Sequence, residues 1–70
     1  MIKVTKLNGK EYYMNAEIVV TIEETPDTII TTSSGNKIVV KETSDEVVKR
    51  IIEYKREIFK EILNMSNKNI

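Results

Sequence analysis

The sequence contains no cysteine, no histidine and no tryptophan. Without cysteine there is no disulfide scaffold, and without cysteine and histidine the usual structural zinc sites cannot be built. A Ser-His-Asp triad and a Cys-His dyad are excluded for the same reason. We therefore expect no cofactor and no metal.

Positive charge is not in excess, because eleven Lys and Arg stand against eleven Asp and Glu. Nucleic-acid binders and polybasic membrane anchors need a surplus of positive charge, so the composition weighs against both. Residues 1–41 carry five basic and five acidic groups, and residues 42–70 carry six of each. Neither part is therefore expected to offer a surface with one sign of charge.

Long hydrophobic runs are also missing. The longest uninterrupted aliphatic stretch covers only residues 18–20, whereas a membrane-spanning helix needs about 20 apolar residues. No basic segment followed by an apolar core and a cleavage site opens the chain. We expect a cytoplasmic protein with no transmembrane segment.

The chain is small, with 70 residues in one expected domain spanning 1–70. A chain of this length buries roughly 60 % of its extended surface and gains only a few kcal/mol from one core. Such chains often depend on disulfides, metals or self-association. Because disulfides are excluded and no metal is expected, we predict a homo-oligomer.

Turn signals divide the first 41 residues into short segments rich in β-branched residues. These signals are Asn8-Gly9, Pro26-Asp27 and the stretch around Gly35. They predict strands at residues 2–7, 10–14, 18–24, 28–33 and 38–41. We expect a five-stranded antiparallel β-meander, either an open sheet or a partly closed barrel.

A helix is predicted to follow at residues 44–64. Thr43 and Glu46 form a capping-box pattern before an apolar stripe with a period of 3.6 residues. Residues 65–70 are predicted to be a frayed tail. The fold class is therefore α+β, with the meander packed against one C-terminal amphipathic helix.

Side chains alternate across a strand, so the hairpin turns decide which residues share a face. With a two-residue loop at Pro26-Asp27, one face is expected to collect Ile22, Ile29, Ile38 and Val40 and to carry the helix. The opposite face also holds aliphatic residues, a predicted self-association surface: Val19, Ile30 and Val39. The alternative is that these strand-forming residues merely tolerate exposure.

The helix provides a second predicted self-association surface. Residues 45–64 span about 30 Å, whereas five strands span about 24 Å. We therefore expect the last apolar group to extend past the sheet: Ile58, Phe59, Ile62, Leu63 and Met65. The alternative is a helix that crosses the sheet diagonally and buries this group.

The carboxylates offer no obvious catalytic pair. Glu23 and Glu24 are adjacent in a predicted strand and therefore point to opposite faces. Asp27 follows Pro26 in a turn, where it is expected to hydrogen-bond the nearby backbone. The sequence predicts that the protein is not an enzyme.

Several segments in order resemble the FlbD family of small flagellar proteins, also called swarming motility proteins SwrD. Residues 1–9 (MIKVTKLNG) resemble the opening of the family. The next matches are NAE at 15–17, IEETPDT at 22–28, Gly35 and VKET at 40–43. The resemblance covers roughly residues 1–56, and the IEETPDT segment is its most specific part.

The resemblance implies a non-enzymatic cytoplasmic accessory that supports motility by promoting the output of the flagellar motor. Its implied partner is a motor or stator protein, met at the inner side of the membrane. The predicted contact is the turn formed by Glu23, Glu24, Thr25, Pro26, Asp27 and Thr28, because loop tips often carry function. The alternative is a small RNA-binding regulator of flagellar gene expression, since five strands and a helix are also the outline of RNA-binding dimers of the carbon-storage-regulator type.

Overall fold

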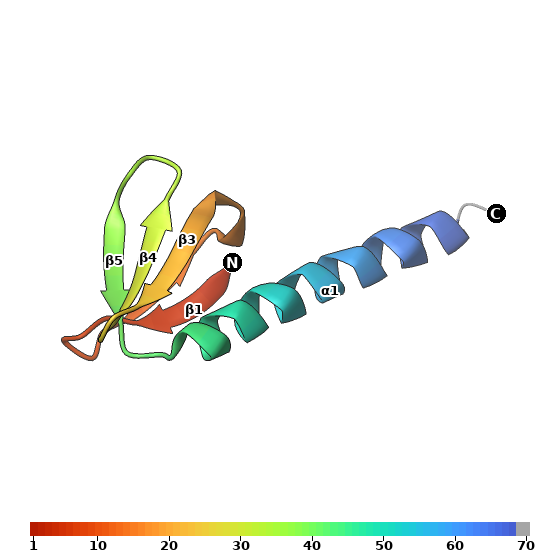
Figure 1. The fold of residues 1–70 in the computed structure, drawn as a ribbon. Coiled ribbons are helices and arrows are strands. Elements are labelled where there is room, and N and C mark those ends of the chain that lie inside the picture. Colours follow the sequence, from red (N-terminus) through yellow and green to blue (C-terminus); the bar gives the residue numbers. More distant parts are fainter. Residues whose placement is uncertain (69–70) are drawn as a thin grey trace.

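The computed structural model describes the backbone of residues 1–68 and the side chains of residues 1–65. Figure 1 shows a small β-rich body at the N-terminal end and one long helix that extends away from it. The elements, in chain order, are β1 (Ile2–Thr5), β2 (Glu11–Met14), the 3₁₀ turn η1 (Ala16–Ile18), β3 (Val19–Glu24), β4 (Thr28–Thr32), β5 (Lys37–Val40) and α1 (Ser44–Lys68).

The strands form two small sheets, and the predicted single five-stranded meander is wrong. β1 and β2 make an antiparallel pair, while β3, β4 and β5 make a second, open sheet in that order. The chain leaves β2 through η1, where the Asn15 side chain accepts a hydrogen bond from the Glu17 amide at 2.9 Å. This turn diverts the chain, so β2 and β3 do not pair. The α+β class is confirmed.

The first hairpin uses a longer turn than the two-residue one expected at Asn8-Gly9. The amide of Lys6 donates to the carbonyl of Lys10, and the amide of Gly9 donates to the carbonyl of Lys6, both at 2.9 Å. Gly9 has a positive φ of 87°, whereas Asn8 does not. This is a three-residue loop closed by a glycine bulge, in which only one position requires the left-handed region.

The register of β4 also differs from the expectation. Glu24 pairs with Thr28, so the β3–β4 loop has three residues and not two. One extra loop residue exchanges the two faces of β4. Ile30 therefore lies opposite Ile22 and Ile38, and the expected neighbour Ile29 points to the other face.

This exchange overturns the predicted second apolar face. Ile30 is fully buried at the centre of the core, and Val19 packs against the same core after an irregularity between Val19 and Thr21 shifts the register of β3. Val39 lies on the opposite face, opposite Ile29. Val19, Ile30 and Val39 therefore do not form one exposed cluster.

The core is assembled from every element except β3, whose Val19 and Ile22 are only partly buried and pack against it. Its buried members come from β1, β2, η1, β4, β5 and α1, and they are Ile2, Val4, Met14, Ala16, Ile30, Val40 and Val47. The two sheets are joined by a bridge between Lys6 and Val40 and by the Lys41 amide donating to the Thr5 carbonyl at 2.8 Å. Helix α1 packs on β1 and β3 and covers this core.

A polar cluster around Glu42 fixes the helix to β1. The carboxylate of Glu42 accepts hydrogen bonds from the Thr5 amide at 2.8 Å and the Thr5 hydroxyl at 2.9 Å. Arg50 donates to the same carboxylate at 2.9 Å and to the Lys3 carbonyl at 2.6 Å. Burial alone would raise the pKa of Glu42, but the hydrogen bonds from Thr5 and Arg50 outweigh it, and the pKa is lowered.

Helix α1 continues to Lys68, beyond the predicted end at residue 64. The predicted frayed tail is therefore helical over residues 65–68, and residues 69 and 70 lie outside the described part. At 1.5 Å per residue, 25 residues make a helix about 37 Å long. The molecule measures 50 × 23 × 19 Å, so the helix must extend well past the sheets. Within residues 1–68, no helix is both long and apolar enough to cross a membrane.

Candidate functional site

Helix α1 has two different halves. In the packed half, residues 44–54, one stripe faces the sheets, and Val47, Ile51 and Tyr54 pack in or against the core. In the free half, residues 55–65, no strand runs alongside the helix, as Figure 1 shows. The exposed fractions there are 37 % for Ile58, 61 % for Phe59, 54 % for Ile62, 48 % for Leu63 and 66 % for Met65.

The expected extension past the sheet is therefore present. It places the predicted self-association residues Ile58, Phe59, Ile62 and Leu63 on one exposed stretch of helix. An exposed group of large apolar side chains of this kind is typical of an interaction surface.

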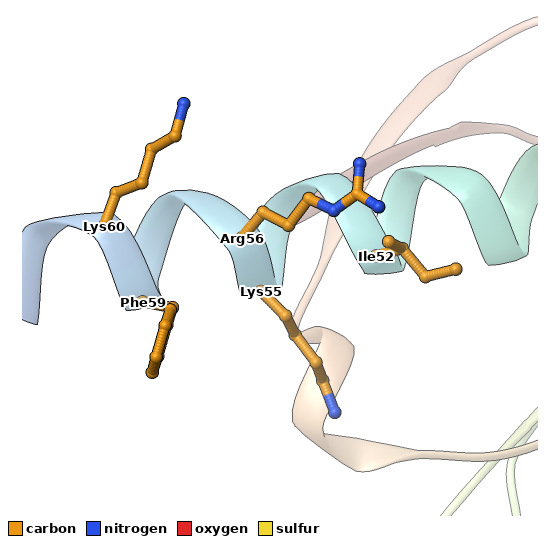
Figure 2. Close-up of a pocket in the computed structure, with 5 residues that line it drawn as sticks. All are labelled: Ile52, Lys55, Arg56, Phe59 and Lys60. Carbon is orange, nitrogen blue, oxygen red and sulfur yellow. The ribbon is translucent and has the colours of Figure 1, made fainter.

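A patch with both apolar and cationic character lies on the outer side of α1. Its floor is formed by Ile52 and Phe59, and its rim by Lys55, Arg56 and Lys60. Figure 2 shows Arg56 and Lys60 on one side of the helix axis and Lys55 on the other, beside Phe59. We call these five residues the cationic patch. Its lining contains no carboxylate.

The charges of α1 are sorted around its axis. By helical geometry the cationic patch lies about 140° from Val47, which faces the core. Glu57 and Glu61 lie about 140° and 180° from the patch centre, on the far side of the helix. Glu53 lies about 100° away, on the flank, and lines the adjoining recess with Asp45, Ile52 and Arg56. The five residues of the patch carry charge of one sign, whereas the recess beside them also holds Asp45 and Glu53, so the expectation of mixed charge fails only locally. Projecting the charged residues onto a helical wheel would have found this patch, because net charge alone hides it.

Only one described ion pair ties a rim cation. Lys60 lies 3.9 Å from the carboxylate of Glu57, and both side chains are 72 % exposed. Such an exposed, solvated pair contributes little energy and breaks easily. The remaining described ion pairs of α1 belong to Arg50 in the packed half. The rim cations thus remain available to an anionic ligand.

The predicted contact turn, residues 23–28, separates into a structural part and an exposed part. The carboxylate of Glu24 accepts a hydrogen bond from the Ser44 amide at 2.5 Å and from the Thr28 hydroxyl at 3.5 Å. Hydrogen bonds from Ser44 lower the pKa of the Glu24 carboxylate, and the bond from the Ser44 backbone amide has the largest effect. Thr28 is buried. Glu24 therefore helps to cap helix α1, since the first amides of a helix lack partners within it.

The exposed part of the turn is its tip, Thr25, Pro26 and Asp27, together with Glu23. A shallow recess lies beside this tip, and Leu7, Lys41 and Thr43 contribute to its lining along with Pro26 and Asp27. Leu7 is 54 % exposed. Sequence reasoning missed Leu7, because its place beside the turn depends on the pairing of the first hairpin with the end of β5.

Neither surface has the arrangement of a catalytic or metal site. Among residues 1–68 there is no group of three or more Asp and Glu side chains placed to hold a metal ion. Glu23 and Glu24 lie on opposite faces of β3, as expected from their adjacency. The two exposed surfaces described above are the turn tip and the cationic patch on α1.

The fold and these surfaces define a small α+β protein whose exposed features are suited to binding other molecules. The family model of FlbD, described as flagellar and swarming motility proteins, matches residues 1–59 of the 70. The chain belongs to the FlbD family. No curated protein and no solved structure matches it. The family match ends within the cationic patch, between Phe59 and Lys60.

Proposed function

We propose that the protein is a non-enzymatic accessory of flagellar motility that promotes the output of the motor through protein–protein contacts. The observation that carries this proposal is membership of the FlbD family over residues 1–59. The proposed partner is a protein of the motor or stator, met at the cytoplasmic side of the membrane. The absence of a paired catalytic constellation among the described residues is consistent with a role in binding.

The proposed contact is the turn tip of Thr25, Pro26 and Asp27 with the adjacent Leu7. The tip is exposed, and it is held from below because Glu24 binds the first turn of α1. A rigidly supported loop tip loses little conformational entropy on binding, which favours affinity. Leu7 adds an exposed apolar side chain at the edge of the same recess.

Deletion of the gene tests the proposed role. We expect reduced swarming and reduced torque of single motors, with a normal number of filaments per cell. Expression of the full chain should restore both. Unchanged motility in the deletion strain would refute the proposal, and loss of filaments would instead indicate a role in flagellar assembly.

The contact is tested with matched variants. Asp27→Ala and Leu7→Ala should weaken crosslinking to a motor or stator protein in cells and should reduce torque. Glu17→Ala is the control, because it removes one exposed carboxylate from η1, away from the turn. An equal loss of crosslinking and torque in the variants and the control would contradict the proposed contact. Unchanged crosslinking and torque in the variants would contradict it as well.

A further inference from the structure

The cationic patch of α1 is built for an anionic occupant. Ile52 and Phe59 provide the apolar part of a lining that also contains Lys55, Arg56 and Lys60. Figure 2 shows Phe59 on the same side as Lys55, and Arg56 and Lys60 on the other side. Phe59 is 61 % exposed and Ile52 is 46 % exposed. Carboxylates are missing from the lining, so the patch attracts negative charge and offers apolar contact at the same place.

A second copy of the chain matches this patch less well than an anionic surface does, because the copy presents the same three cations. In an antiparallel pair of helices, each flank meets the same flank of the partner, so the flank with Arg56 and Lys60 meets the same two cations, and Glu53 is the acidic residue nearest to them on that flank. In a parallel pair the two flanks exchange, and Lys55 then faces Arg56 and Lys60. Both arrangements bring more cations than anions together at this face, which is less favourable than contact with an anionic surface.

A docked peptide helix is also a poor match, because the patch is not a groove. All five lining residues come from one helix, and no second element provides a wall. Recognition of an amphipathic peptide generally uses an apolar groove. A flat, extended surface needs only one open helix face, as in amphipathic helices that lie in the membrane interface.

We propose that the outer face of α1 binds to the surface of an anionic lipid bilayer. Ile52 and Phe59 insert at the level of the headgroups, with Val48 and Leu63 continuing the same face toward the two ends. These two residues are 43 % and 48 % exposed. Lys55, Arg56 and Lys60 reach sideways to lipid phosphates while their aliphatic stems cover apolar surface.

Most acidic residues of α1 point away from this face. The exceptions are Asp45, near Val48 at the N-terminal end of the face, and Glu53 on its flank, which line the recess beside Ile52 and Arg56. Glu57 and Glu61 lie on the far side of the helix, and a helix is about 10 Å across. That distance is close to the screening length at physiological salt, which is about 8 Å. Their repulsion from the lipid surface is therefore largely screened. The sheets pack around Val47, on a different side of α1 from the patch.

Sedimentation of the full chain with vesicles tests the proposal. We expect binding to phosphatidylcholine vesicles that contain about 30 mol % phosphatidylglycerol, and much weaker binding to phosphatidylcholine alone. Binding to the anionic vesicles should fall as salt is raised. The test uses purified protein, so its outcome does not depend on the proposed role in motility.

Matched variants localise the binding. Lys55→Gln with Arg56→Gln should lower the affinity for anionic vesicles about 25-fold, at about fivefold for each cation. Phe59→Ala should lower it about tenfold. Lys10→Gln with Lys37→Gln is the control, because it removes the same charge from exposed positions outside α1. It should leave the affinity nearly unchanged.

Three results would overturn the proposal. The first is no binding of the unchanged protein to anionic vesicles. The second is an equal loss of affinity in the control and the patch variants. The third is binding in solution to an acidic amphipathic peptide, used as a probe, without any binding to vesicles, which would assign the patch to a protein partner.

Discussion

The two halves of helix α1 resemble each other in composition but differ in what covers them. Both alternate apolar and charged residues, and both contain adjacent basic pairs, Lys49-Arg50 and Lys55-Arg56. In the packed half, Val47 is fully buried and Arg50 binds Glu42 and the Lys3 carbonyl. In the free half, large apolar residues such as Phe59 remain exposed.

This difference shows that one amphipathic pattern can serve two purposes along a single helix. The apolar stripe of the packed half completes a core that is small because the chain is short. The same periodicity in the free half extends past the sheets and is open to an external partner. Substitutions in the apolar stripe of the packed half should therefore lower stability. Equivalent substitutions in the free half should instead affect binding.

The largest expected difference in the free energy of unfolding is between the variants Val47→Ala and Phe59→Ala. Removing two methyl groups from a fully buried site should lower the free energy of unfolding by about 2 kcal/mol. Truncating the exposed Phe59 should change it by less than about 0.5 kcal/mol. Urea denaturation followed by circular dichroism measures both. Similar losses in the two variants would show that the free half is covered.

The polar cluster of the packed half should have the next largest effect. Glu42→Gln weakens the acceptor of two Thr5 hydrogen bonds and of the Arg50 ion pair. We expect a loss of about 1–2 kcal/mol in urea denaturation. Glu57→Gln is the control, because its only described ion pair is with exposed Lys60. It should change the free energy of unfolding very little.

The same cluster predicts how stability depends on pH. The pKa values of Glu24 and Glu42 are lowered in the folded state from their usual value of 4.5. The unfolded chain therefore binds protons first, so this stabilisation is complete above pH 4.5 and is lost as the pH falls through the folded-state values. The urea midpoint should fall below about pH 5, and less steeply in Glu42→Gln. A pH dependence that is unchanged in this variant would contradict the assignment.

The cap of the packed half should contribute less. The Thr43 hydroxyl accepts a hydrogen bond from the Glu46 amide at 3.2 Å, as an N-cap residue does. Thr43→Ala should cost about 1 kcal/mol, whereas Thr43→Ser should keep most of the stability. Thermal melting of both variants tests this. Equal destabilisation by alanine and serine would show that the methyl group, and not the hydroxyl, matters.

The smallest effect on stability is expected from the predicted self-association surface. Ile58 and Ile62 lie on the side of the free half that continues the core-facing stripe, away from the centre of the cationic patch. Ile58→Asp with Ile62→Asp should leave urea denaturation of the isolated chain nearly unchanged but lower the mass measured by light scattering. A monomeric unchanged protein would contradict the predicted self-association.

Local patterns in the sequence predicted most of the elements, because turn and cap signals act over a few residues. Gly9 and Gly35 do mark turns, and α1 begins at Ser44 directly after the predicted cap Thr43. The prediction of which β4 residues share a face was wrong, because the register depends on one extra residue in the loop after Glu24. Of the two hydrogen bonds of the predicted capping box, the one from the Glu46 amide to the Thr43 hydroxyl forms. The Glu46 carboxylate instead accepts a hydrogen bond from Arg50.

The candidate surfaces were predictable to different degrees. Ile58 and Phe59 were expected to be free because helix and sheet lengths can be compared from the sequence. Leu7 was missed because its position beside Pro26 needs the contact between the first hairpin and β5. Lys55, Arg56 and Lys60 were hidden by a neutral total charge, which carries no information on direction around the helix axis.

By itself, the sequence determined the α+β class, the single amphipathic helix, the exclusion of cysteine and histidine chemistry, and the membership of the FlbD family. Only the tertiary structure decided that the strands divide into two sheets, that Ile30 is buried, and which part of α1 is left uncovered. The physical reason is the distance along the chain over which each interaction acts. Composition and turn signals act locally, whereas register, burial and the sorting of charge depend on which distant segments meet.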